Sequence, residues 1–452
     1  MEDVPCGSID ILVARDNNWK TRAHENENQG IMIEKKEISD EKALLIGVIR
    51  HGTTETIINE HLDELELLAE TAGAKVIGRI TQKVSKINPS TFIGKGKAQQ
   101  IISQAKELGA KLILFDDELS PAQIKNYHQL SEKIKVLDRS GLILDIFQKH
   151  ARSKEATTQV DLAYLEYLLP RLTRQWTHLE RQMGGIGTRA GMGETQIEVD
   201  RRLIRTRITR LKKDLSKIEK ERSTQSLRRQ SEFRVSLVGY TNAGKSTLFR
   251  SLTGADVFIQ DQLFATLDTT VRKLNFDTSH TILLSDTVGF IRKLPHNLVA
   301  SFKSTLKEVL EADLILMVLD MSSPQVLDHM NTIQEVLSDM EANEIPTIQV
   351  LNKVDLISDG NMIEKIKRSF PDAVAISAQQ HLRLSELKAK IVEHMEANYQ
   401  TIDLQFPYED GKTIAQAQEG VEVLERSYEE DGVKLKIRGS RSRIDQILAR
   451  VN

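Results

Sequence analysis

The sequence predicts an α/β protein built from several domains, and three observations support this. Strand-like apolar runs alternate with helical patterns in two stretches, 42–140 and 231–398, as expected for parallel sheets covered by helices. A purely helical region, 141–230, separates them, and strands outnumber helices in the last segment, 399–452. In the second stretch a glycine-rich loop joins the first strand to the first helix. With 452 residues, the chain is long enough for several separate cores.

Composition limits the classes to which the chain can belong. It is 40% hydrophobic and 28% charged with a formal net charge of -3, so only local charge could attract a nucleic acid. A single cysteine, Cys6, excludes a disulfide framework and a cysteine-based metal site. No apolar run approaches the ~20 residues of a membrane span, and the first residues lack a secretion-signal pattern. We expect a cytoplasmic protein with no integral membrane segment and a mostly disordered polar leader, 1–41.

The stretch 42–140 is predicted to be a small parallel α/β domain. We expect strands at 43–49, 76–80, 111–115 and 134–137, and helices at 57–69, 98–108 and 123–132. The segment from Gly94 to Lys97 resembles a phosphate loop, but too few glycines precede it and no hydroxyl follows Lys97. We interpret it as a turn that starts a helix, and contact with RNA or a second nucleotide stays open.

The helical region 141–230 is predicted to be a hairpin. An apolar helical pattern runs through Leu162 and Leu165 to Pro170, and a highly charged helix follows at 198–222. The glycine-rich segment 184–193 lies between them and is too flexible for either helix to continue through it. We therefore expect a flexible tip.

A phosphate-binding loop is the first functional motif of the stretch 231–398. It follows an apolar strand at 235–238 and precedes a helix at 247–252, which is the context that such a motif requires. Backbone N–H groups of the loop and the helix N-terminus favour phosphate oxygens. Lys245 should reach the β and γ phosphates, and the Ser246 hydroxyl should bind Mg²⁺, a cation that prefers oxygen ligands. The loop residues expected around the phosphates are Gly239, Tyr240, Thr241, Asn242, Ala243, Gly244, Lys245 and Ser246.

A second motif selects the base. The carboxylate of Asp355 can accept hydrogen bonds from N1–H and the exocyclic amine of guanine, whereas adenine offers an acceptor at N1. The motif comprises Asn352, Lys353, Val354 and Asp355 and directly follows a strand at 347–351. A third segment, Ser377, Ala378 and Gln379, fits the loop whose backbone supports the base, although alone it is a weak signal. GTP and GDP are therefore the predicted ligands.

Two further segments are predicted to sense the γ-phosphate. In the one formed by Asp286, Thr287, Val288 and Gly289, Asp286 should contact Mg²⁺ through water and the Gly289 N–H the phosphate. The other comprises Phe264, Ala265, Thr266, Leu267 and Asp268 and should supply one hydroxyl to the metal. We favour Thr266 for this role, with Thr269 as the reserve.

Phe290 occupies the position at which Ras-type enzymes often carry the glutamine that orients the attacking water. A phenyl ring cannot do this, so we expect slow intrinsic hydrolysis and a partner that completes the site. Packing of Phe290 against the switch helix is a compatible alternative. Only Lys245 and Gly289 are assigned as phosphate stabilisers, and no catalytic residue is identified.

Taken together, these loops resemble those of the HflX family, in the Obg/HflX group of translation-factor-related P-loop GTPases. The resemblance runs from about residue 43 to the C-terminus. Besides the nucleotide loops it rests on the segments 92–97, 191–202 and 286–295, of which the second is long and specific. It implies a P-loop GTPase domain at 231–398, binding to the large ribosomal subunit and its rRNA, stimulation by ribosomes, and a role in splitting or rescuing stalled ribosomes.

Local charge gives independent support for RNA binding. Residues 181–230 contain fourteen Lys or Arg against six Asp or Glu, a local excess of eight. The candidate RNA contacts are Arg189, Arg201, Arg202 and Arg205. The alternative is a solvated helix with i,i+4 ion pairs.

Two other functions stay open on the sequence. The N-terminal domains could remodel RNA under a regulatory GTPase domain, or the chain could be a non-ribosomal Obg/Era-like signalling GTPase. The C-terminal segment lacks a KH-type GxxG clamp, which disfavours an Era-like protein. We expect the chain to act as a monomer.

Overall fold

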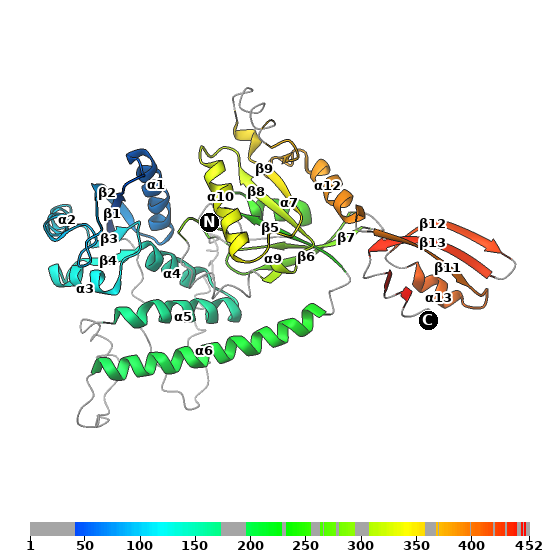
Figure 1. Cartoon of the computed structure of the whole chain (residues 1–452), viewed down its shortest axis with the longest axis horizontal. Helices are drawn as coiled ribbons and strands as arrows, with labels where there is room; N and C mark the ends of the chain where they lie inside the picture. The colour runs from blue at the N-terminus through cyan, green and yellow to red at the C-terminus, as the bar shows by residue number, and fades with distance from the viewer. Residues whose placement is uncertain are drawn as a thin grey trace, which may run out of the picture.

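The computed structural model describes most of the chain. The described residues are 41–172, 196–227, 232–254, 263–264, 266–276, 280–293, 307–357, 368, 370–397, 399–418, 421–429, 432–440, 444–445 and 447–448. Residues 1–40 of the polar leader, the glycine-rich segment 184–193 with Arg189, and Ala265 lie outside them. Figure 1 shows the order of the units, with the predicted α/β architecture confirmed.

The N-terminal unit is a parallel sheet with strand order β2-β1-β3-β4. Its strands are β1 (Lys42–Ile49), β2 (Lys75–Lys83), β3 (Leu112–Phe115) and β4 (Lys135–Asp138). Its helices are α1 (Glu55–Thr71), α2 (Lys95–Glu107), α3 (Pro121–Leu130) and α4 (Arg139–His150). Alternate β1 side chains face opposite cores: Leu45 packs with α1 and α4, and Ile46 with α2 and α3. Both faces of the sheet are thus covered, as its apolar strands require.

The helix α4 begins at Arg139, next to the predicted domain boundary at residue 140. Asp138 ends β4 and caps α4 by accepting a 2.8 Å hydrogen bond from the Gly141 N–H. Leu142 and Ile146 of α4 then pack into the core that includes α1. In the structure α4 therefore covers one face of the N-terminal sheet, and the boundary at residue 140 stays a prediction.

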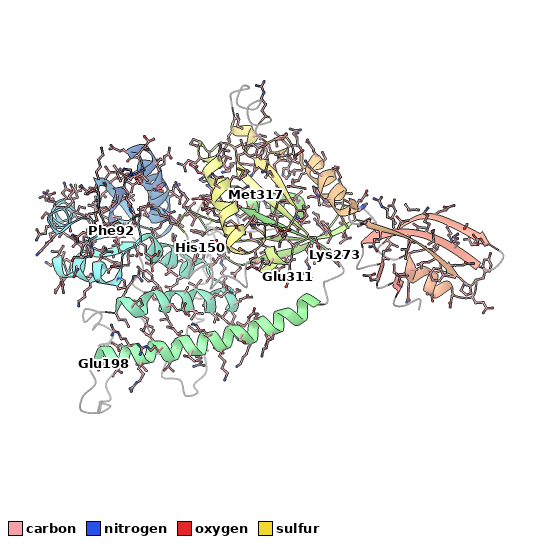
Figure 2. The ribbon with its side chains drawn as sticks, viewed as in Figure 1. Phe92, His150, Glu198, Lys273, Glu311 and Met317 are labelled. Atoms are coloured by element: carbon pink, nitrogen blue, oxygen red, sulfur yellow. The ribbon has the colours of Figure 1, made fainter. Side chains whose placement is uncertain are left out.

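The helices α5 (Lys154–Leu168) and α6 (Gln196–Leu227) form the middle region, with a short 3-10 turn, η2 (Leu169–Arg171), after α5. Leu162 and Leu165 of α5 pack against Ile204 and Leu211 of α6. In Figure 2, Glu198 marks the end of α6 that lies away from the GTPase domain. With 32 residues, α6 is about 48 Å long, so one helix runs along the whole middle region.

The second α/β unit has the strand order β10-β9-β8-β5-β7-β6, with only β6 antiparallel to its neighbour. Its strands are β5 (Phe233–Gly239), β6 (Thr270–Asn275), β7 (Thr281–Asp286), β8 (Leu314–Asp320), β9 (Thr347–Asn352) and β10 (Val374–Ala375). Its helical segments are α7 (Lys245–Thr253), α9 (Lys307–Leu310), α10 (Val326–Asp339), η4 (Val354–Leu356) and α12 (Leu384–Ala397). The parallel strands bring their carboxyl ends to one edge of the sheet, where ligands bind in such folds.

The C-terminal unit is a three-stranded antiparallel sheet of order β11-β13-β12. It consists of β11 (Tyr399–Phe406), α13 (Gly411–Ala417), β12 (Glu422–Glu429) and β13 (Gly432–Ser440). Phe406, Leu435 and Ile437 share its core with Ile444 and Ile447. In the described part of the chain, no helix is both long and apolar enough to cross a membrane.

Candidate nucleotide site

The phosphate loop joins β5 to α7, and its backbone shape depends on two residues with positive φ. Asn242 has φ 60° and Gly244 has φ 90°. A side chain on Gly244 would place Cβ 2.3 Å from the amide nitrogen of Asn352. Gly239 is equally constrained, because a Cβ there would lie 2.4 Å from the Val318 carbonyl oxygen. The glycines therefore let the loop close tightly over the sheet edge.

Lys245 is the first residue of α7, and its side chain turns back onto the backbone of the loop. Its ammonium donates to the carbonyl oxygens of Gly239 at 3.1 Å and Tyr240 at 2.9 Å. The residue is only 6% exposed, and burial lowers the pKa of Lys245 to about 8, partly opposed by the nearby Asp286 carboxylate. A buried cation held by backbone carbonyls favours a ligand that brings negative charge, as a phosphate does.

The three residues predicted to lie near magnesium are in direct contact. The Ser246 hydroxyl is 2.8 Å from the Thr266 hydroxyl and donates to Oδ2 of Asp286 at 2.7 Å. Among the described residues, Oδ1 of Asp286 has no hydrogen-bond partner although it is buried. Burial raises the pKa of Asp286, and the Lys245 ammonium opposes this. Two hydroxyls and a buried carboxylate form an all-oxygen donor set, which fits Mg²⁺.

The base-selecting residues meet the phosphate loop through one buried amide. Asn352, 2% exposed, donates to the Ala243 carbonyl at 2.9 Å and accepts from the Ala378 N–H at 3.0 Å. It thereby joins three loops that are distant in sequence. Lys353, in the left-handed region with φ 63°, pairs with Asp320 at 2.8 Å. Asp355 follows in η4 with its side chain exposed, where the carboxylate can meet a base.

Gly289 brings the second sensing segment against the phosphate loop. A Cβ on Gly289 would lie 2.7 Å from the Thr241 Cα and 3.1 Å from the Lys245 ammonium. The next residue, Phe290, pairs with the loop backbone: its N–H donates to Gly239 at 3.0 Å and its carbonyl accepts from Thr241 at 2.7 Å. Its ring is buried in an apolar cluster, whereas the residues that directly follow 293, where the switch helix is expected, lie outside the described part of the chain.

The first sensing segment contacts the N-terminal half as well as the site. Phe264 packs edge-on against Phe147 of α4, with ring centroids 4.7 Å apart. The Asp268 carboxylate accepts hydrogen bonds from the backbone N–H groups of Arg152 at 3.1 Å and Ser153 at 3.2 Å, at the start of α5. These two N–H groups belong to the residues just before the first turn of α5, so the Asp268 carboxylate contacts the other half of the chain. That Asp268 also lies at the nucleotide stays a prediction.

The predicted RNA-contact residues in the described part of the chain lie on α6. Arg202 and Arg205 have exposed side chains, and Arg201 is half-buried. Lys212 pairs with Glu166 of α5 at 2.8 Å, so this ion pair joins two helices. The basic face of α6 is thus present on the surface of the middle region.

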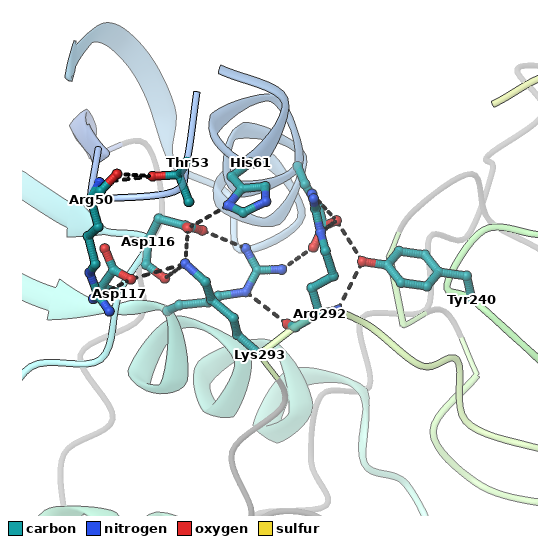
Figure 3. A network of polar contacts seen from close by, with 10 residues as sticks. Arg50, Thr53, His61, Asp116, Asp117, Tyr240, Arg292 and Lys293 are labelled. Carbon is teal, nitrogen blue, oxygen red and sulfur yellow. Dashed lines mark hydrogen bonds and ion pairs between the residues drawn. The ribbon is translucent and has the colours of Figure 1, made fainter. Parts of the chain in front are cut away.

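A buried polar cluster lies at the interface between the N-terminal unit and the GTPase domain, and the sequence analysis did not predict it. It joins Tyr240 and the segment after Phe290 to Glu64, Asp116 and Arg139 of the N-terminal unit (Figure 3). The one sequence feature that could have pointed to this cluster is the basic pair Arg292 and Lys293, which directly follows the apolar residues Phe290 and Ile291. Nothing in the sequence identified its acidic partners.

Comparison with known protein families also assigns this chain to GTP-binding proteins. Residues 234–353 match the family model described as "50S ribosome-binding GTPase". Residues 59–148 match "GTP-binding GTPase N-terminal", and residues 150–229 match "GTP-binding GTPase Middle Region". All three units before the C-terminal sheet therefore have counterparts in GTPases.

Curated relatives cover most of the chain. A "GTPase HflX" of Flavobacterium psychrophilum is 45% identical over 398 residues, which is 83% of this chain and 95% of the relative. A "GTPase HflX" of Escherichia coli is 44% identical over 387 residues, 84% of this chain and 89% of the relative. A solved GTP-binding protein from Sulfolobus solfataricus in complex with GDP is 26% identical, with a TM-score of 0.39, over 78% of this chain and 98% of that one. The identity and coverage of the curated relatives show that the chain belongs to the HflX family of GTPases.

Proposed function

We propose that this GTPase requires magnesium, binds the large ribosomal subunit and its rRNA, and acts as a GTP-controlled ribosome splitting or rescue factor. The observation that carries the proposal is a packed connection from the nucleotide site to the basic helix α6. Asp268 of the first sensing segment accepts a hydrogen bond from the backbone N–H of Ser153, the N-cap residue of α5, and α5 packs on α6 through Leu162 and Leu165. The match to a ribosome-binding GTPase model over 234–353 points to the same class of partner.

The residues of the site have separate roles in GTP binding and hydrolysis. Ser246 and Thr266 would hold the magnesium ion, with Asp286 acting through water. When bound, the ion neutralises charge on the β and γ phosphates. Lys245 would stabilise the same oxygens, and the Gly289 N–H would contact the γ-phosphate. Asp355 would select guanine.

The surroundings of Phe290 support the proposal that fast hydrolysis requires a partner. Its ring is 2% exposed and packs in the interface core, and its backbone is paired with the phosphate loop. The side chain therefore leaves the position of the water-orienting glutamine without a polar group. A group supplied by the ribosome would complete the site.

GTP hydrolysis measured with and without purified large subunits tests this proposal. We expect slow turnover alone and stimulation of about 10-fold or more by large subunits, with little effect of small subunits. Lys245→Ala should abolish turnover, and Asp355→Asn should weaken selection of guanine. Equal rates with and without large subunits would contradict the ribosome role while leaving the GTPase activity intact.

A further inference from the structure

The buried polar cluster at the interface connects the N-terminal unit with the γ-phosphate-sensing segment (Figure 3). Its central cation is Arg139 at the start of α4, whose side chain is 2% exposed. The guanidinium donates to Glu64 and to Asp116 at 2.8 Å, both in its own unit. Its Nε donates across the interface to the Arg292 carbonyl at 3.2 Å. Arg139 therefore binds the backbone three residues after Gly289.

Glu64 binds the same segment through its carboxylate. One carboxylate oxygen accepts from the Tyr240 hydroxyl at 2.7 Å and from Arg292 at 2.8 Å and 3.1 Å. The Tyr240 hydroxyl in turn accepts the Arg292 backbone N–H at 2.9 Å. Burial alone would raise the pKa of Glu64, but Arg139, Arg292 and the Tyr240 hydroxyl outweigh it and keep that pKa low. Glu64 is therefore an ionised contact between the phosphate loop and the sensing segment.

Lys293 extends these contacts along the N-terminal unit. Its ammonium pairs with Asp116 and, at 3.1 Å, with Asp117. Arg50 also pairs with Asp117, at 2.9 Å. Lys293 has φ 53°, a conformation that is uncommon outside glycine and that this set of contacts holds in place. Both basic side chains after Ile291 are thus bound by carboxylates of the other unit.

The conformation in which this cluster forms is the one expected with GTP. In P-loop GTPases the first sensing threonine reaches the metal only while the γ-phosphate is present. Here the Thr266 hydroxyl lies 2.8 Å from Ser246, within the oxygen set that fits the metal. The same N-terminal unit also contacts the first sensing segment, through Phe147 against Phe264. Interface contacts and the GTP-like arrangement therefore occur together.

We propose that Glu64 and Arg139 are positioning residues that make the site prefer GTP over GDP. They act through Tyr240 and Arg292, and they stabilise the arrangement of both sensing segments that the γ-phosphate requires. By thermodynamic linkage, bound GTP stabilises the interface contacts by the same free energy by which these contacts strengthen the binding of GTP. The inference rests on the GTPase activity alone and is independent of the ribosome role.

Two variants of the full chain test this inference. Glu64→Gln keeps the shape of the side chain and removes its charge. Tyr240→Phe removes only the hydroxyl that joins Glu64 to Arg292. The matched control is Glu66→Gln, on the same helix, because Glu66 pairs with Arg79 away from the interface. Thermal unfolding establishes that each protein is folded before nucleotide is added.

The readout is the dissociation constant for fluorescent GDP and for a non-hydrolysable fluorescent GTP analogue. Coupling between two sites commonly changes a binding affinity by about 5-fold to 150-fold. Each test variant should therefore raise the dissociation constant of the GTP analogue by about 5-fold or more and that of GDP by less than about twofold. Glu66→Gln should change neither constant. Equal weakening of both nucleotides, or no change in either test variant, would overturn the inference. If Glu64→Gln is unfolded, Tyr240→Phe decides alone.

Hydrogen exchange provides a second readout that a merely structural role would not move. In the wild type, amides of α1 and α4 should exchange more slowly with the GTP analogue than with GDP. In Glu64→Gln this difference between nucleotides should disappear. A nucleotide-dependent difference that persists in the variant would contradict the assigned role of Glu64.

Discussion

Replacing Arg139 with methionine should destabilise the N-terminal unit, and the structure allows the size of the effect to be worked out. Removing one partner of a buried ion pair costs about 3–5 kcal/mol, because the remaining charge is left uncompensated. Here Glu64 keeps Arg292 at 2.8 Å, and Asp116 keeps Lys293. The lower end therefore applies, and we expect a loss of about 3 kcal/mol, or about 100-fold in the opening equilibrium.

Native-state hydrogen exchange of the β1 and β3 amides measures this free energy within the full chain. The control is Arg79→Met, since Arg79 is a partly exposed side chain that pairs with Asp63 and Glu66. Exposed ion pairs contribute about 0–1 kcal/mol, so this variant should have a small effect. A loss below about 1 kcal/mol for Arg139→Met would refute the reasoning that its carboxylate partners depend on it.

Three further predictions concern single residues. Gly289→Ala should reduce both the rate of GTP hydrolysis and the affinity for the GTP analogue, measured by titration, by about 10-fold or more. The reason is that the added Cβ would lie 2.7 Å from the Thr241 Cα. Unchanged turnover would contradict this placement of Gly289. Asn352→Ala removes two buried hydrogen bonds, each costing about 1–3 kcal/mol when one partner is left unpaired, so calorimetry should show GDP binding at least about 10-fold weaker. Folding lowers the pKa of Glu64, so the ionised carboxylate stabilises the folded protein. This stabilisation is complete above the pKa of Glu64 in the unfolded chain, about 4.3, and is lost as the pH falls through the lower pKa of the folded state. The difference in urea stability between wild type and Glu64→Gln should therefore shrink between pH 5 and pH 3, and a constant difference would argue against an ionised Glu64.

The nucleotide loops could be predicted from the sequence because each is local. A strand, a short loop and a helix or turn follow one another around Lys245, and the same holds around Asn352. Chemistry then determines what each loop can bind, and parallel strands bring the loops to one edge. The alternation of strands and helices likewise sufficed for the fold class.

The interface cluster could not be predicted, because its contacts link distant parts of the chain. Tyr240 and Glu64 are 176 residues apart, and Arg292 and Glu64 are 228 apart. Each carboxylate lies in a helix or loop where a charged residue is ordinarily solvated, so only tertiary packing shows that it is buried. For the same reason the sequence did not show the contacts of the Asp268 carboxylate, whose partners just before α5 are 115 and 116 residues away.

Cosedimentation with purified large ribosomal subunits tests most directly whether the nucleotide controls ribosome binding. The protein is compared in the presence of a non-hydrolysable GTP analogue and in the presence of GDP, at equal saturation of the site. We predict cosedimentation with the analogue and release with GDP, because only the γ-phosphate orders both sensing segments. Equal binding in the two nucleotide states would contradict the account.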